Sequence, residues 1–201
     1  KEIVCLNKCI SVGHSVLNLS KLMFYELYYD KLLPKIETLP NAKMELLFGD
    51  TDSVMIGLQN VDIRTQLNPL IYDFLDTSNY PIDHPLYSTS KKAQLGCIKD
   101  ETKGKNILEV VLARPKSYSI LYEDKYEHKR NKGVTQAVMH SSITHQHYKN
   151  SYNTTKAQYF DQVSIRSNKH HLSTVTFNKK CISLNDDKRY WITKNRSYPY
   201  G

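Results

Sequence analysis

The sequence predicts an α+β protein, in which helices pack against antiparallel sheets built from hairpins. Near the N-terminus, apolar residues recur at intervals of three and four, as they do along one face of a helix. Residues 45–58 place a short acidic turn between two apolar runs, which is the pattern of a β-hairpin. Strand-like apolar runs return between residues 95 and 122. Together these patterns favour the α+β class.

The first predicted element is an amphipathic helix over residues 13–34. Gly13 precedes the apolar pattern, and Pro34 is expected to end it because proline lacks the backbone N–H that a helix interior requires. The apolar residues form one stripe, which we expect to pack in the core. Its members are Val16, Leu19, Leu22, Met23 and Leu27.

The elements that follow are a hairpin and a second helix. Residues 40–58 predict a strand, an acidic turn and a strand. The second helix is expected to begin at Asn68 as its N-cap, with Pro69 in the first turn, where a missing N–H costs nothing. Its expected buried side consists of Leu70, Ile71 and Phe74.

The remaining chain predicts loops, strands and a basic second part. Residues 78–88 contain two prolines and are expected to form an ordered surface loop. Strand patterns fill residues 95–122 and are interrupted by a turn at residues 103–105. The charged stretch 123–134 is the expected boundary between two parts of the chain. Beyond it, residues 144–160 are compatible with a helix, and residues 173–186 alternate like a hairpin.

The charge of the chain favours an acidic partner. The net charge is +8 and the pI is about 9.2. Residues 1–100 carry 10 Lys and Arg against 12 Asp and Glu, whereas residues 101–201 carry 18 against 8. A basic half is typical of a surface that binds a polyanion, although a solubilising surface has the same composition. The 15 tyrosines suit wet interfaces and stacking surfaces, and ordinary half-buried strand positions as well.

The cysteines and the absence of targeting signals indicate an intracellular protein. No C-x-x-C pair occurs, and two neighbouring cysteines alone do not provide the four ligands of a structural zinc site. We expect free thiols that are mostly buried, at Cys5, Cys9, Cys97 and Cys181. There is no signal peptide and no apolar run long enough to span a membrane, so no membrane partner is expected. Because the sequence starts without Met and stops abruptly, we expect it to be part of a longer protein.

The acidic turn itself has two interpretations from its residues alone. Asp50 and Asp52 stand one residue apart between the two apolar runs. A solvated turn explains them, and a bare D-x-D pair also arises by chance. Alternatively, repulsion between the two carboxylates calls for a cation, and hard ions such as Mg²⁺ take carboxylate oxygens together with substrate phosphates. Both interpretations remain open at this level.

The wider sequence resembles a known family. FGDTDS (48–53) is similar to Y-G-D-T-D-S, motif C of family B DNA polymerases, which lies on the palm hairpin that carries catalytic carboxylates. Further segments occur in the order expected of protein-primed members of the Maverick/Polinton transposon type. These segments are VGHSVLNLSKLMFYELYYD, LLFGDTDSV, YPIDHPLYS, KDETKGKNILEVVLARPKSYSI, KGV and LNDDKRY. The resemblance covers most of the chain and identifies it as a C-terminal fragment of such a polymerase.

The resemblance implies a fold and a set of catalytic residues. Residues 1–122 would form the second half of the palm, an antiparallel sheet with packed helices, and residues 123–201 a small thumb subdomain. Asp52 is implied as a direct metal ligand and Asp50 as a supporting one, both in catalytic roles. Thr51 and Ser53 would shape the turn.

A second set of residues is implied to bind DNA. RPKSY matches the family's K-x-Y motif, so Lys116 and Tyr118 resemble the pair that grips primer-template near the primer terminus. Lys116 offers a charge for a phosphate, and Tyr118 offers a hydroxyl and a ring toward the sugar or base. Arg114 begins the same motif. Arg130 and Lys132 lie in KRNKGV, at the expected start of the thumb, and could follow the duplex backbone.

Two family motifs are missing from the sequence. Neither D-x-x-S-L-Y-P, with the second palm aspartate, nor the fingers motif K-x-x-x-N-S-x-Y-G is present, and the exonuclease acids are missing too. The two-metal Mg²⁺ site, in which Mn²⁺ could substitute, would therefore need an aspartate outside this chain. We expect the isolated fragment to be inactive as a nucleotidyltransferase.

The resemblance also implies partners, and the motifs leave alternative functions open. The implied partners are primer-template DNA, deoxynucleoside triphosphates and a terminal priming protein, in an intracellular location that is nuclear for a eukaryotic transposon. A catalytically dead transposon remnant that only binds DNA would keep the same motifs, and the upstream reading frame would distinguish it from an enzyme. A nucleotide-sugar transferase that holds Mn²⁺ with D-x-D is a third hypothesis, but it leaves Lys116, Tyr118 and the basic half unexplained.

Overall fold

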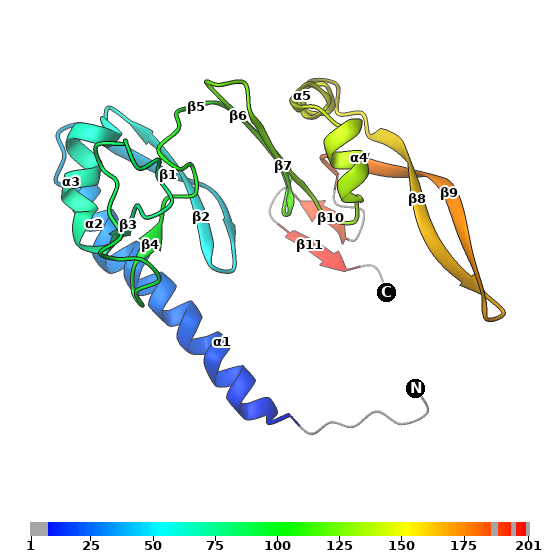
Figure 1. Cartoon of the computed structure of the whole chain (residues 1–201), viewed down its shortest axis with the longest axis horizontal. Coiled ribbons are helices and arrows are strands. Elements are labelled where there is room, and N and C mark those ends of the chain that lie inside the picture. The colour runs from blue at the N-terminus through cyan, green and yellow to red at the C-terminus, as the bar shows by residue number, and fades with distance from the viewer. Residues whose placement is uncertain (1–7, 186–188, 194–195, 200–201) are drawn as a thin grey trace. The chain divides into compact units, whose positions relative to one another are not determined.

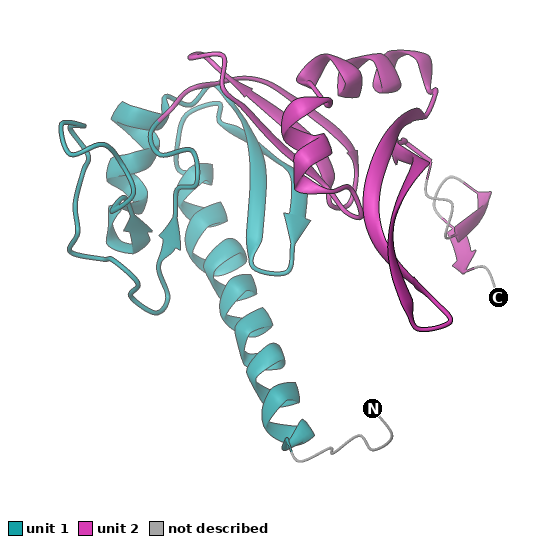
Figure 2. Ribbon diagram, turned by 45° about the vertical axis from the view of Figure 1, so that its right-hand side comes forward, with its two compact units in different colours: residues 1–104 teal, residues 105–201 magenta. Residues whose placement is uncertain are grey.

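The chain forms two compact units that both mix helices with small sheets. The computed structural model describes residues 8–185, 189–193 and 196–199. Unit 1 comprises Lys1–Gly104 and unit 2 comprises Lys105–Gly201 (Figure 2). The mixed helix and strand content with small antiparallel sheets agrees with the predicted class. The units divide at Gly104, ahead of the boundary expected after residue 122, and the palm and thumb assignment stays a prediction.

Unit 1 begins with helices and continues with a hairpin, short helices and a small parallel pair of strands (Figure 1). Its elements are α1 (Ile10–Tyr25), the π-helical η1 (Glu26–Leu32), α2 (Leu33–Glu37), β1 (Lys43–Asp50), β2 (Ser53–Gln59), the π-helical η2 (Ile63–Leu67), α3 (Asn68–Ile71), the 3₁₀ turn η3 (Tyr72–Phe74), β3 (Leu75–Asp76) and β4 (Ile98–Lys99).

The first helical region is longer than predicted at both ends. It starts at Ile10, and α1, η1 and α2 follow one another directly as far as Glu37. Pro34 therefore does not end the helix, and that expectation was wrong. Pro34 occupies the first turn of α2, after the wider turns of η1, and at this position a helix tolerates a residue without an N–H.

The predicted apolar stripe lies mostly outside the core, which corrects a second expectation. Of its five residues only Leu27 is buried; Leu22 and Met23 are exposed, and Val16 and Leu19 have exposed fractions of 60% and 59%. In Figure 1, α1 extends away from the other elements of its unit. Periodicity correctly predicted the helix, but nothing among the described residues covers this face of it.

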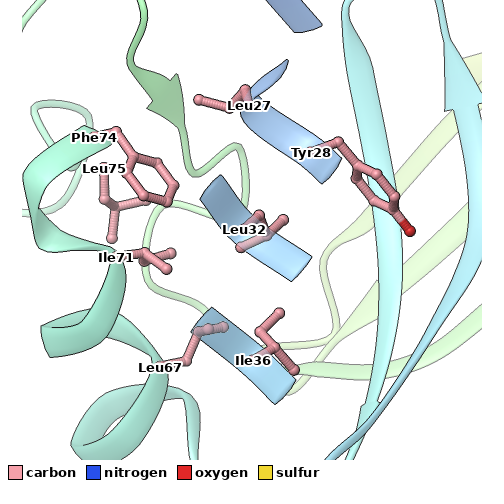
Figure 3. Packing of buried hydrophobic residues seen from close by; sticks show 8 residues of the cluster. All are labelled: Leu27, Tyr28, Leu32, Ile36, Leu67, Ile71, Phe74 and Leu75. Carbon is pink, nitrogen blue, oxygen red and sulfur yellow. The ribbon is translucent and has the colours of Figure 1, made fainter. Parts of the chain in front are cut away.

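The core of unit 1 joins the end of the first helical region to the second one. Figure 3 shows Leu27, Leu32 and Ile36 on one side, with residues of η2, α3 and β3 facing them. One face of the β1–β2 hairpin packs against this cluster through half-buried apolar residues. The buried cluster comprises Leu27, Tyr28, Leu32, Ile36, Leu67, Ile71, Phe74 and Leu75, and the hairpin adds Met44, Val54, Ile56 and Leu58.

The second helix also begins earlier than predicted. Asp62 is its N-cap, because the carboxylate accepts a hydrogen bond of 2.7 Å from the backbone N–H of Thr65. The proposed cap, Asn68, instead lies inside the helical run and is buried. Ile71 and Phe74 are buried as expected, whereas Leu70 is only half-buried.

The loop between β3 and β4 is ordered by polar contacts. Asp76 is buried and accepts hydrogen bonds from the backbone N–H groups of Ser78 and Ala93. Tyr80 is also buried, and its hydroxyl donates to Asp100. Burial raises the pKa of Tyr80, and its hydrogen bond to the Asp100 carboxylate raises it further. These contacts fix the surface loop expected over residues 78–88.

Unit 2 contains a three-stranded sheet, two helices and two hairpins (Figure 1). Its elements are β5 (Ile107–Arg114), β6 (Ser117–Tyr122), β7 (Glu127–Asn131), α4 (Gln136–Ser141), α5 (His145–Thr154), β8 (Gln158–Asn168), β9 (His171–Ile182), β10 (Arg189–Thr193) and β11 (Arg196–Pro199). Strands β5, β6 and β7 form one antiparallel sheet in that order, β8 pairs with β9, and β10 pairs with β11.

The predictions for this unit are confirmed in outline. The strands over 107–122 and the helix within 144–160 are present, but the stretch 123–134 contains β7 and so belongs to the sheet. The hairpin predicted within 173–186 is instead one strand, β9, paired with the preceding β8. The hydrophobic core joins β5, α4, α5 and β9 through Val111, Val138, Met139, Ile143, Tyr148, Cys181 and Ile182.

The cysteines are less buried than predicted. Cys181 is buried, Cys97 is half-buried and Cys9 is exposed, all as free thiols, while Cys5 lies outside the described residues. Burial raises the pKa of the Cys181 thiol. The pKa of the Cys9 thiol is lowered by hydrogen bonds from the Ser11 hydroxyl and from the backbone of Val12. Within residues 8–185, 189–193 and 196–199, no helix is both long and apolar enough to cross a membrane.

Candidate active site and nucleic-acid interface

The two predicted catalytic aspartates lie at the tip of the β1–β2 hairpin. The strands are antiparallel, and Asp50 pairs with Ser53 as the last rung before the turn. Thr51 and Asp52 are the two turn residues. Asp52 is exposed and Asp50 is half-buried. The structure thus brings the four predicted motif residues together at one end of a hairpin whose inner face is held by the core of unit 1.

The turn has a strained backbone. Thr51 has a φ of 62°, and the N–H of Asp52 donates a hydrogen bond of 2.7 Å to the carbonyl of Asp50. A hydrogen bond from residue i+2 to residue i around a positive φ defines the rarer, strained form of the γ-turn. Positive φ is particularly unfavourable for a β-branched residue such as Thr. A conformation of this kind persists only where the surrounding structure imposes it, and such positions concentrate at functional sites.

Side-chain hydroxyls within the turn contact Asp50. The Thr51 Oγ1 atom donates to Asp50 Oδ1 at 3.3 Å, and Ser53 Oγ donates to the Asp50 carbonyl at the same distance. Both bonds are long and therefore weak. They connect Thr51 with the carboxylate of the half-buried Asp50 and Ser53 with its backbone carbonyl. Asp52, the other acidic residue of the turn, is exposed.

The donor set of the tip fits part of a site for a hard divalent cation. Carboxylate oxygens are the ligands that Mg²⁺ takes from proteins, usually one or two of them together with substrate phosphates. Asp52 and Asp50 would hold the ion. Among the residues that the structure describes, no three His, Cys, Asp or Glu side chains gather in a group that could hold a metal ion. The hairpin would therefore contribute two carboxylates to such a site.

The predicted DNA-binding residues gather at one end of the β5–β6–β7 sheet in unit 2. Arg114 pairs with Ser117 at the end of β5, and Pro115 and Lys116 form the turn between them. Lys116 has a φ of 61°. Proline at the first central position and positive φ at the second are the features of a type II turn, which projects the exposed Lys116 at the sheet end.

The same end of the sheet carries the other predicted contacts. Tyr118 pairs with Arg130 across β6 and β7, so both side chains lie on one face of the sheet. The Tyr118 ring stacks on His128, with centroids 6.0 Å apart. The backbone N–H of Lys132 donates to the carbonyl of Lys116 at 2.9 Å, which holds these two basic residues together. All five predicted residues therefore lie at one end of the same sheet.

The opposite face of the sheet holds a buried polar cluster that sequence patterns did not indicate. Ser119 is buried and its Oγ lies 2.8 Å from Nδ1 of the buried His145 in α5. Glu109 accepts a hydrogen bond of 2.9 Å from Lys149, and its Oε2 lies 3.5 Å from His145 Nε2. The hydrogen bond from Lys149 lowers the pKa of Glu109. These partners are far apart in sequence, so no local spacing could have revealed them.

The two candidate sites belong to different units. The acidic hairpin is part of unit 1, and the basic end of the sheet is part of unit 2. The tail segment around LNDDKRY is divided: residues 186–188 lie outside the described residues, whereas Arg189 and Tyr190 begin β10.

Comparison with known proteins found no match. No protein-family model matches the chain, and no curated protein and no solved structure is similar to it. The resemblance to family B polymerases therefore rests on the motifs in the sequence alone.

Proposed function

We propose that this chain is the C-terminal palm and thumb part of a DNA-directed DNA polymerase, which adds deoxynucleotides to a primer 3′-hydroxyl on a DNA template. The observation that carries the proposal is the strained acidic tip of the β1–β2 hairpin. Asp50 and Asp52 flank Thr51, which is held at positive φ, at the position that the motif C resemblance implies. Of the ten described non-glycine residues at positive φ, Thr51 is the one that lies between two aspartates.

In this function the hairpin provides negative charge at a fixed position. Asp52, exposed at the tip, would be the direct ligand of Mg²⁺, and Asp50, which accepts a hydrogen bond from the hydroxyl of Thr51, would support it. When bound, the ion supplies positive charge that stabilises the anionic phosphates of the reaction. The core packing of the hairpin keeps the carboxylates in place, so little reorganisation is needed when the substrates bind.

The basic end of the sheet provides the grip on primer-template DNA. Lys116 and the neighbouring arginines would contact phosphates, which fixes the register of the duplex but reads no sequence. Tyr118, half-buried and stacked on His128, is positioned by its ring and offers a hydroxyl to the sugar or base. Such contacts suit an enzyme that must accept any template sequence.

A second candidate is a protein that binds DNA without catalysis. The observation in its favour is that the described residues bring only the two hairpin aspartates to the tip and gather no third metal-binding side chain around them. Nucleotidyl transfer by two metal ions uses several ligands. The enzyme therefore requires the missing aspartate and fingers motifs from the complete reading frame, and the binding protein does not.

Primer extension by the product of the complete reading frame tests the proposal. The intact protein should extend a primer with Mg²⁺, and Asp52→Asn should reduce the rate by orders of magnitude because it removes a ligand charge but keeps the size of the side chain. Asp83→Asn is the matched control, since Asp83 is an exposed aspartate elsewhere in unit 1. Residues 1–201 alone should incorporate no nucleotide.

The outcomes separate the two candidates. Near-normal extension by Asp52→Asn would assign the hairpin to a solvated turn and contradict the proposal. DNA binding without any extension by the intact protein would favour the catalytically dead remnant. Robust extension by residues 1–201 alone would show that the missing motifs are not needed.

A further inference from the structure

The hairpin formed by β10 and β11 presents aromatic rings beside arginines on both of its faces. On one face, Tyr190 pairs with Tyr198 across the strands, and their rings stack with centroids 5.8 Å apart and an interplanar angle of 25°. The guanidinium of Arg196 lies 5.3 Å from the centroid of the Tyr198 ring and donates to its hydroxyl. Arg196, Tyr198 and Tyr190 thus form a short column.

The other face repeats this combination with tryptophan. Trp191 pairs with Ser197, and successive residues of a strand point to opposite faces, so its indole lies away from the tyrosine column. Arg189 shares the face of Trp191, where its Nε donates to Ser197 Oγ at 2.8 Å and its Nη2 to the Ser197 carbonyl at 3.2 Å. Each face therefore holds an aromatic surface and a guanidinium in fixed positions.

These rings are not used to build the core. The exposed fractions are 57% for Trp191, 47% for Tyr190 and 37% for Tyr198. Of the residues described, none from β10 or β11 belongs to either buried hydrophobic cluster. Because a two-stranded hairpin with exposed aromatic rings gains little from its own packing, a partner that covers the rings would stabilise it.

The charge of the hairpin indicates the chemistry of that partner. Neither strand contains Asp or Glu, and each begins with an arginine. Each guanidinium has five N–H donors, so the internal contacts of Arg189 and Arg196 leave donors for an anion. A partner with flat apolar groups joined by negative charges is a single-stranded nucleic acid, because in a duplex the stacking of neighbouring base pairs covers the faces of the bases.

We propose that the β10–β11 hairpin binds single-stranded nucleic acid, with bases stacked on Trp191 and on the Tyr190–Tyr198 pair and phosphates held by Arg189 and Arg196. The binding is sequence-tolerant, because every base offers a ring face. The proposal adds a single-strand site to the duplex contacts of the proposed polymerase. It does not depend on the acidic hairpin, and either one can fail without the other.

The hairpin contains its own spectroscopic reporter. Trp191 is the single tryptophan of the chain, so intrinsic tryptophan fluorescence reports on this hairpin alone. The full chain is titrated with an oligo(dT) of about 12 nucleotides, a length within the usual site size of single-strand binding modules. Stacking should quench the fluorescence. An oligo(U) arm shows whether RNA is bound as well as DNA, and an abasic oligonucleotide of the same charge should bind more weakly without quenching.

Substitutions locate the site. Tyr198→Leu should weaken oligo(dT) binding about five-fold or more, since each stacked base contributes roughly 1–3 kcal/mol. Tyr198→Phe keeps the ring and should retain the affinity, which shows that the loss in Tyr198→Leu is a loss of stacking and not of folding. Tyr159→Leu is the matched control, because Tyr159 is an exposed tyrosine on β8 in the same unit.

Three results would overturn the proposal. Equal affinity for oligo(dT) and the abasic strand would show that phosphates alone are bound. Unchanged affinity in Tyr198→Leu would remove the tyrosine column from the site. A concentration-dependent dimer in sedimentation that Trp191→Leu abolishes, without any fluorescence change on adding DNA, would assign the rings to a second copy of the chain.

Discussion

The Oγ atom of Ser119 lies 2.8 Å from Nδ1 of His145, although 26 residues separate them in the sequence. Both side chains are buried, and the bond joins β6 to the first turn of α5. The backbone N–H of His145 also donates to Glu127 Oε2 at 3.0 Å, which ties the helix to β7. Strand β6, which follows Lys116 and carries Tyr118, and its neighbour β7 are thus both hydrogen-bonded to α5.

Removing the hydroxyl of Ser119 should destabilise unit 2. Ser119→Ala leaves a buried ring nitrogen of His145 without its partner, and an unsatisfied buried polar group costs about 1–3 kcal/mol. Urea unfolding followed by circular dichroism measures the loss in the free energy of unfolding. Ser167→Ala, at an exposed position of β8, is the control and should change stability by less than about 0.5 kcal/mol. Equal stability of the two variants would mean that the buried bond contributes nothing.

The salt dependence of DNA binding should report on Lys116. Each phosphate contact contributes a slope of about −0.9 in log affinity against log salt. Lys116→Ala should therefore weaken binding to a primer-template and make the slope shallower by roughly one unit. Tyr118→Phe removes a hydroxyl but no charge, so affinity should fall with an unchanged slope.

The control for this experiment is Lys92→Ala, which removes the same charge from an exposed position of unit 1. Fluorescence anisotropy across a salt series measures all four proteins. If the slopes of Lys116→Ala and Lys92→Ala coincide, then Lys116 does not contact a phosphate.

Unit 1 should lose stability in acid because of Asp76. Burial by itself raises the pKa of this carboxyl, but the hydrogen bonds from Ser78 and Ala93 and the nearby Lys99 ammonium outweigh it and hold the pKa below its usual value. The unfolded chain, with a pKa of about 3.9, then binds the proton first. The stabilisation is therefore present above about pH 4 and is lost as pH falls toward the lower folded-state pKa.

Asp76→Asn tests whether the loss of stability in acid originates from this carboxyl group. The variant should unfold more readily than the wild type at neutral pH, and the difference between them should shrink as the pH falls below about 4. Denaturant unfolding at a series of pH values gives both curves. Asp83→Asn, at an exposed position, should run parallel to the wild type throughout. A constant difference at every pH would place the acid-sensitive group elsewhere.

The strain at Thr51 should be relieved by glycine. Thr51→Gly keeps the φ of 62° at no steric cost and should raise the free energy of unfolding by about 1 kcal/mol. Thr51→Pro should have the opposite effect, because proline fixes φ near −65°. Ser53→Gly, one step inside the strand, is the control and should destabilise the hairpin. Thermal unfolding compares the three, and a destabilised Thr51→Gly would show that the turn is not strained.

The sequence predicted those elements of the fold whose residues all lie within one short segment. The acidic hairpin could be predicted because its apolar runs and its turn lie within one short segment. The end of the first helix could not, because Pro34 is tolerated only after the wider turns of η1. Similarly, the N-cap falls on Asp62 rather than Asn68 because a π-helical turn precedes α3, and periodicity does not reveal such a turn.

The residues of the candidate sites also fall into those that a local motif predicts and those that depend on how distant segments pack. Lys116 and Tyr118 stand in one motif, whereas strand pairing places Arg130 beside Tyr118 and a backbone hydrogen bond joins Lys132 to Lys116. The contact of Ser119 with His145, by contrast, depends on where α5 packs. The β10–β11 hairpin was missed because its strands are short, and because Trp191 and Ile192 stand next to each other in β10, so that apolar and polar residues do not alternate.

The exposed stripe on α1 has a consequence for how the chain folds. None of the 16 residues of α1 is buried, and its sequence includes Gly13 and β-branched residues but no ion pairs within the helix. A single helix of this length has a helix–coil equilibrium near balance in water. Amide hydrogens of α1 should therefore exchange close to the rate of a free peptide, whereas those near Leu32 and Ile36 exchange only on global unfolding. Any polypeptide that covers the stripe would order α1 as it binds, so its affinity would include the free energy of forming the helix.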